Sequence, residues 1–116
     1  MTKGNCFFES ERREQELTLT LFGEIDHHSA VRVRTEMDAL LYEERPSRVV
    51  MDLSHIEFMD SSGLGLIMGR YALMQRLGGE LILRRPHKRL VQIFELAGLQ
   101  RMVRIEETAE EKEENQ

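Results

Sequence analysis

The sequence lacks the features that define several large classes of protein. It has one cysteine, Cys6, which can neither close an internal disulfide nor build a zinc site by itself. No stretch approaches the ~18 consecutive apolar residues of a membrane-spanning helix. The first twenty residues do not follow the basic, apolar, small-residue order of a secretory signal. We therefore expect a cytoplasmic protein that is not a disulfide scaffold and does not enter a membrane.

The composition is typical of one small folded domain. The chain has 116 residues, of which 41% are apolar and 32% are charged. Its formal net charge of −5 is concentrated in residues 106–116, which hold six glutamates and one lysine, so residues 1–105 sum to zero. Because residues 1–105 carry no net charge, they are not expected to bind a nucleic-acid backbone. We expect a single domain over 1–116, with an ordered core of about 5–105 and a solvated acidic tail over 106–116.

The pattern of apolar residues predicts three strands in the first half of the chain. Residues 17–22 alternate with period two, which indicates a half-buried strand that ends at Gly23. The apolar run 5–8 predicts an antiparallel partner, joined to it through the polar stretch 9–15. A continuous apolar run at 48–53 is typical of a strand covered on both faces.

Helices are predicted where apolar residues recur at spacings of three and four, and Asp26 or Ser29 can cap the first of them. The predicted helices span 28–43, 61 or 62 to 77, and 88–97, and two further short strands span 81–83 and 102–105. Strands that alternate with helices pair in parallel. The fold class is therefore α/β, a single domain with a small mixed, mainly parallel sheet and helices packed against it.

The most informative segment is Phe58–Gly65, which reads FMDSSGLG and opens the second helix. It follows the third strand, at the sheet edge where ligands and partners usually bind. One interpretation is structural: Asp60 or Ser61 caps the helix, and the glycines allow close packing. The other is a covalent switch, because the free N–H groups and the dipole at a helix start favour a phosphate. A phosphoserine would add about −1.5 to −2 charge beside Asp60 and prevent a partner from resting there.

Other patterns of catalytic or binding residues are incomplete. The glycines from Gly63 onward miss the dinucleotide-binding spacing by one residue, and the sequence has neither a P-loop nor a hydrolase serine motif. His27 and His28 are adjacent, so on a helix they would not share a face as a metal pair does. His55 and His87 are expected in solvent-exposed turns. We therefore predict no catalytic residue, no metal, no cofactor and no enzyme activity.

Two motifs together resemble a known family. The segment Gly23–His28, which follows the alternating strand, and the segment Phe58–Gly65 are similar to those of STAS domains, and the likeness extends over 17–105. Within that family the Asp26-His27-His28 run resembles the sporulation members of the anti-anti-sigma factors. The resemblance implies a protein whose unphosphorylated form binds an anti-sigma factor that is also a serine kinase, and so releases a sigma factor. Phosphorylation by that kinase would end the binding, and a PP2C-type phosphatase would restore it.

The resemblance also assigns roles to residues. It implies phosphorylation of Ser61, with Ser62 as the adjacent alternative, and a monomer that binds no nucleic acid. The implied partner-binding surface consists of Asp26, His27, Asp60, Ser61, Ser62, Gly63 and Leu64. Two alternative functions stay open: a scaffold or sensor module of a stress-signalling complex, and a nucleotide-binding STAS domain.

Overall fold

Five strands lie side by side in one sheet, in the order in which they follow along the chain. The computed structural model describes residues 5–107, and its elements are β1 (Cys6–Arg13), β2 (Glu16–Ile25), α1 (His27–Glu44), β3 (Arg48–Met59), α2 (Ser61–Arg76), β4 (Glu80–Arg84), α3 (Lys88–Leu96), the 3-10 helix η1 (Leu99–Arg101) and β5 (Arg104–Glu106). β1 and β2 are antiparallel, whereas β2–β3, β3–β4 and β4–β5 are parallel. The predicted α/β fold with a mixed, mainly parallel sheet is confirmed.

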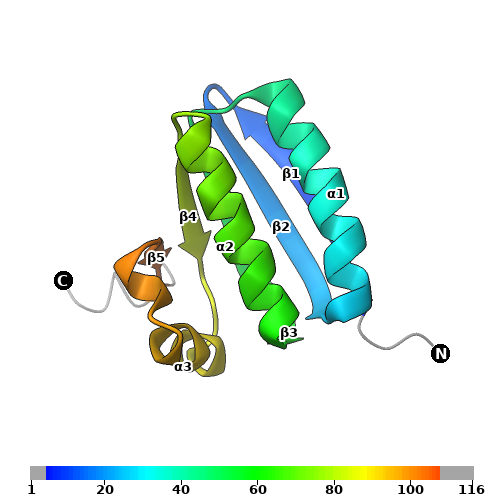
Figure 1. Cartoon of the computed structure of the whole chain (residues 1–116), viewed down its shortest axis with the longest axis vertical. Coiled ribbons are helices and arrows are strands. Elements are labelled where there is room, and N and C mark those ends of the chain that lie inside the picture. The colour runs from blue at the N-terminus through cyan, green and yellow to red at the C-terminus, as the bar shows by residue number, and fades with distance from the viewer. Residues whose placement is uncertain (1–4, 108–116) are drawn as a thin grey trace.

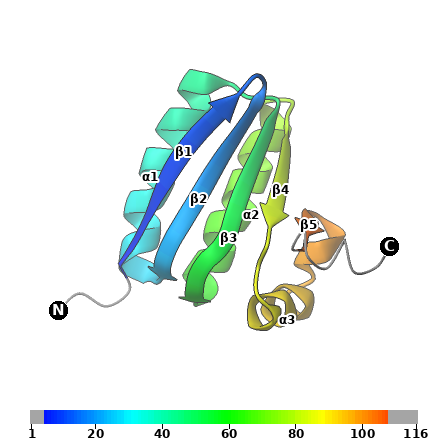
Figure 2. The same ribbon diagram turned by 180° about the vertical axis from the view of Figure 1, so that it is seen from behind.

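Two helices cover one face of the sheet. α1 and α2 lie side by side in front of the strands in Figure 1, and Figure 2 shows the strands from behind, in front of both helices. α3 lies beyond the carboxyl end of β4. The core between sheet and helices contains the alternating leucines of β2 and the inward stripe of α1: Leu17, Leu19, Leu21, Val33, Met37 and Leu41. The two periodicities therefore predicted these buried side chains.

β1 is longer than the sequence predicted. The strand expected at 5–8 extends to Arg13, because the polar stretch predicted as a connection pairs with β2 as far as Arg13↔Glu16. Strand pairing uses backbone groups, so an edge strand needs apolar side chains only where it touches the core. In β1 that part is Cys6 and Phe8. Burial raises the pKa of the Cys6 thiol to about 11.

β2 also runs past its predicted end at Gly23 and reaches Ile25. The pairing of β2 with β3 shifts register immediately after Gly23. Gly23 has φ +101°, and a Cβ added there would lie 2.0 Å from the carbonyl oxygen of Asn5. A glycine is therefore required at this bulge, which lets the strand continue rather than ending it.

β3 extends beyond its predicted end at 53, as far as Met59, because it keeps pairing with the extended β2. The prediction that His55 lies in a turn is consequently wrong. His55 is a strand residue whose ring stacks on Phe22, with 4.8 Å between the ring centroids. A continuous run of apolar residues could not reveal this extension, since only Ile56 and Met59 are buried in the added part and the other residues are exposed.

The C-terminal elements differ from prediction in their bounds and in one additional short helix. α2 ends before Gly78, which has φ +79°, as the glycine pair predicted. A 3-10 helix occupies residues 99–101 and moves the last strand from the predicted 102–105 to 104–106. Glu106 thus belongs to β5, and residues 108–116 of the predicted acidic tail lie outside the described part of the chain.

Candidate functional site at the first turns of the two helices

The carboxyl ends of β2 and β3 bring two aspartates together. Ile25 and Met59 are paired partners in the parallel ladder, and the next residues along the chain are Asp26 and Asp60. The backbone N–H of Asp60 donates to the carbonyl oxygen of Ile25 at 3.2 Å, which fixes one strand end against the other. α1 and α2 therefore start next to each other, and Asp26 lies beside the start of the helix that carries Ser61.

Asp26 caps α1. Its Oδ1 accepts a hydrogen bond from the backbone N–H of Ser29 at 2.9 Å, and Ser29 Oγ accepts one from the backbone N–H of Asp26 at 3.1 Å. Both residues that the sequence offered as caps are thus parts of one reciprocal capping box. The hydrogen bond from the Ser29 backbone is the main cause that holds the pKa of Asp26 below its usual value.

Asp60 caps α2 in a similar way. Its Oδ1 accepts a hydrogen bond from the backbone N–H of Ser62 at 2.8 Å. Ser61 is the first residue of the helix and is exposed, whereas Ser62 is half-buried. The two serines therefore differ in access: only Ser61 presents its hydroxyl from an exposed residue at the free end of the helix.

The two glycines of the motif have different environments. A Cβ added to Gly63 would lie 2.6 Å from Met59 Cβ and 2.8 Å from its sulfur, so Gly63 lets α2 approach β3 closely. Gly65 is exposed, and a Cβ there would have open space around it. The expectation of glycines for close packing is correct for Gly63 and wrong for Gly65.

A groove runs between the first turns of α1 and α2, which we call the α1–α2 groove. It has a volume of about 260 Å³ and is lined by His27, Ala30, Val31, Arg34, Ser62, Gly65 and Leu66. Of the predicted partner surface, it contains His27 and Ser62. The sequence interpretation missed Val31 and Arg34, although an apolar residue off the buried stripe of α1, such as Val31, is a recognisable signal of a binding surface.

Three apolar side chains on β3, α2 and α1 are exposed. Phe58, which precedes the capping aspartate, is 49% exposed, and Met68, two turns into the helix, is 41% exposed. Val31, on the facing side of α1, is 49% exposed. Val31 lines the α1–α2 groove together with Ser62, and an exposed apolar side chain in a groove is typical of a protein-binding surface.

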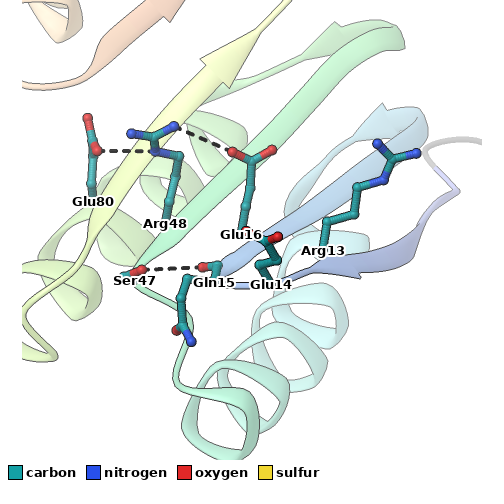
Figure 3. Close-up of a pocket in the computed structure, with 7 residues that line it drawn as sticks. All are labelled: Arg13, Glu14, Gln15, Glu16, Ser47, Arg48 and Glu80. Carbon is teal, nitrogen blue, oxygen red and sulfur yellow. Dashed lines mark hydrogen bonds and ion pairs between the residues drawn. The ribbon is translucent and has the colours of Figure 1, made fainter.

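A larger hollow of about 860 Å³ lies at the opposite end of the sheet (Figure 3). It is lined by residues at the amino ends of the parallel strands, where Arg48 Nη1 is 3.5 Å from Glu16 Oε1 and Arg48 Nε is 3.4 Å from Glu80 Oε1. These ion pairs link β2, β3 and β4. None of the predicted site residues lines this hollow.

Residues 5–107 contain neither a cluster of metal ligands nor a membrane-spanning helix. Within this range no three or more histidine, cysteine, aspartate or glutamate side chains are grouped so as to hold a metal ion. Among the same described residues, none of the helices has the length and apolar character needed to cross a membrane. His27 and His28 lie with their ring centroids 6.3 Å apart at the start of α1.

Comparison with known proteins agrees with this architecture. Residues 8–112 match the STAS domain family, which is most of the chain. The chain belongs to the STAS domain family.

Within that family its relatives are anti-sigma factor antagonists. The anti-sigma F factor antagonist of Paenibacillus polymyxa is 35% identical over 87% of this chain and 86% of its own length. The anti-sigma-B factor antagonist of Bacillus subtilis is 28% identical over 91% of this chain and 95% of its own length. The chain is also similar to the structure of the Bacillus cell fate determinant SpoIIAA in the phosphorylated form, with a TM-score of 0.70 and 27% identity. The match covers 94% of this chain and 98% of that one.

Proposed function

We propose that this chain is an anti-sigma factor antagonist that is switched by phosphorylation of Ser61. In the unphosphorylated state it binds an anti-sigma factor that is also a serine kinase, and the sigma factor is released. The kinase then uses ATP to phosphorylate Ser61, the antagonist dissociates, and a PP2C-type phosphatase resets it. The observation that carries the proposal is an exposed serine at the first position of α2, beside a capping aspartate and next to the α1–α2 groove, which the exposed Val31 lines.

The position of Ser61 suits a reversible phosphate. Unpaired N–H groups and the positive end of the dipole at the start of α2 stabilise an anion, so the fold tolerates the modification. A phosphate there adds about −1.5 to −2 charge next to the carboxylate of Asp60. A partner seated over this surface would have to bury both charges, which costs several kcal/mol unless they are paired. Binding is then lost without unfolding.

The partner surface in this proposal consists of the residues that the motif named together with Val31, which is exposed in the α1–α2 groove. Asp26 and Asp60 fix the two helix starts, and Gly63 lets α2 lie close to β3. His27 lines the α1–α2 groove, and Leu64 is partly buried against the core. The chain acts as a monomer in the cytoplasm, where its unpaired Cys6 stays reduced.

We further propose that the chain functions in sporulation, as an antagonist of an anti-sigma F factor. The support is that the run Asp26-His27-His28 resembles the sporulation members, and that the anti-sigma F factor antagonist of Paenibacillus polymyxa is 35% identical to this chain. The anti-sigma-B factor antagonist of Bacillus subtilis is 28% identical. Binding assays against anti-sigma F and anti-sigma B factors from the same organism test this choice, and preference for the latter would contradict it.

The main experiment incubates the chain with a purified anti-sigma factor kinase and ATP, followed by peptide mass mapping. We expect one phosphate on Ser61, and we expect Ser61→Ala to stay folded and to hold the kinase without being phosphorylated. Ser10→Ala, at an exposed serine of β1 outside the proposed surface, is the matched control, which should be phosphorylated normally. Phosphate found mainly on Ser62 would reject the assignment, and ATP hydrolysis by the isolated chain would favour a nucleotide-dependent function instead.

A further inference from the structure

The α1–α2 groove combines an apolar floor with a positive wall. Ala30 and Val31 of α1 and Leu66 of α2 supply the apolar surface, and the bare backbone at Gly65 keeps the groove open. Arg34 lies one turn further along α1 and lines the same groove. The lining residues include no carboxylate, so the groove carries positive charge that its own walls do not neutralise.

Arg34 differs from Arg32, two positions earlier, in its side-chain contacts. Among residues 5–107 the Arg34 side chain takes part in no salt bridge or side-chain hydrogen bond, whereas Arg32 ion-pairs with Glu36 at 3.7 Å. The nearest carboxylate on the same face of α1, one turn away, is Asp38, and its Oδ1 lies 2.9 Å from Nε of the buried Arg70. Asp38 is therefore committed to Arg70 and leaves the charge of Arg34 available.

We infer that the α1–α2 groove receives an acidic segment of the anti-sigma factor kinase, with an apolar side chain seated on the floor and a carboxylate on Arg34. The inference rests on the proposed function and names the chemistry of the partner at that site. Apolar surface in the groove supplies affinity, and the unpaired cation selects a partner segment of opposite charge.

The same arrangement explains how a phosphate on the neighbouring serine acts on the groove. Ser62 lines the groove and Ser61 precedes it in the chain, so a phosphate on Ser61 adds negative charge next to a residue of the groove. The phosphate repels the carboxylate of the kinase and attracts Arg34. The repulsion opposes docking of the partner segment, and the attraction neutralises the positive charge that the segment needs.

Substitutions of Arg34 test the inference. The full chain and its variants are titrated with a purified anti-sigma factor kinase at low and at high salt. Arg34→Gln should weaken binding by about threefold or more and Arg34→Glu by about tenfold or more, and Arg34→Lys should keep most of the affinity. The loss should shrink at high salt, because exposed charges are then screened. Arg34 is exposed, so the unfolding midpoint should not change.

Two control variants separate the groove from general surface effects. Arg32→Gln removes one positive charge from the same helix outside the groove and should leave affinity unchanged. Val31→Ser should weaken binding, whereas Leu96→Ser, at an apolar residue that is 90% exposed on α3, should not. If the wild type binds the kinase and is phosphorylated on Ser61 while Arg34→Glu binds equally well, the groove assignment is wrong and the switch stands. A wild type that ignores the kinase overturns both.

Discussion

Asp26 and Asp60 occupy equivalent positions at the ends of two neighbouring parallel strands. Each directly follows one member of the paired residues Ile25 and Met59, and each caps the helix that comes next. The same arrangement, a capping aspartate directly after a paired strand residue, thus aligns the first turns of α1 and α2. The groove and the exposed Ser61 are consequences of that alignment.

Replacing Ser61 with aspartate should separate binding from folding. Ser61→Asp places a negative charge at the first position of α2, where the helix dipole favours it, so the melting temperature should stay within about 4–8 °C of the wild type. Affinity for the anti-sigma factor kinase should fall substantially, as measured by calorimetric titration. Collapse of the fold would instead indicate a structural serine.

The two glycines of the motif should respond in opposite ways to alanine. Gly63→Ala forces a methyl group against Met59 and should destabilise the fold by about 1–3 kcal/mol. Gly65→Ala meets open space within a helix and should be neutral or stabilise by up to about 1 kcal/mol. Urea denaturation measures both, and equal effects would show that α2 does not approach β3 as described.

Stability in acid should depend on Asp52, which is buried in β3. Although burial acts to raise its pKa, hydrogen bonds from Arg85 and Ser54 outweigh that effect and lower the pKa below its usual value. The unfolded state therefore binds the proton more readily than the folded state. The stabilising effect of the ionised group is complete above the ordinary aspartate pKa of about 3.9 and is lost as pH falls through the lowered value.

The corresponding measurement is urea unfolding at neutral and at acid pH. Asp52→Asn should reduce stability at neutral pH and should lose less on acidification than the wild type does. Glu43→Gln, at an exposed residue of α1, serves as the control and should follow the wild type at both pH values. A variant of Asp52 that loses as much in acid as the wild type would contradict the assignment.

Deletion of residues 108–116 should leave affinity for the kinase nearly unchanged. The proposed binding surface lies at the starts of α1 and α2, whereas this segment follows β5 at the other edge of the sheet. Its acidic composition is typical of a solvated end. A large loss on calorimetric titration of the truncated chain would show that the segment takes part in binding.

Local patterns predicted the helices and their caps well, because a helix is decided by residues within a few positions of each other. The stripe through Val33 and Met37 and the capping residues Asp26 and Asp60 needed no knowledge of the rest of the chain. The extents of β1 and β3 were not predictable in this way. Their last parts are held by backbone pairing to β2, and such pairing leaves no mark in the apolar pattern.

The sequence by itself determined the elements, their order and therefore a parallel α/β sheet with a serine at the start of its second helix. Only the tertiary structure decided which exposed side chains share a surface with that serine. Val31 and Arg34 belong to α1 and reach the groove because the paired ends of β2 and β3 set the two helices side by side. Contacts between residues about thirty positions apart depend on strand register, and register is fixed by the packing of the whole sheet.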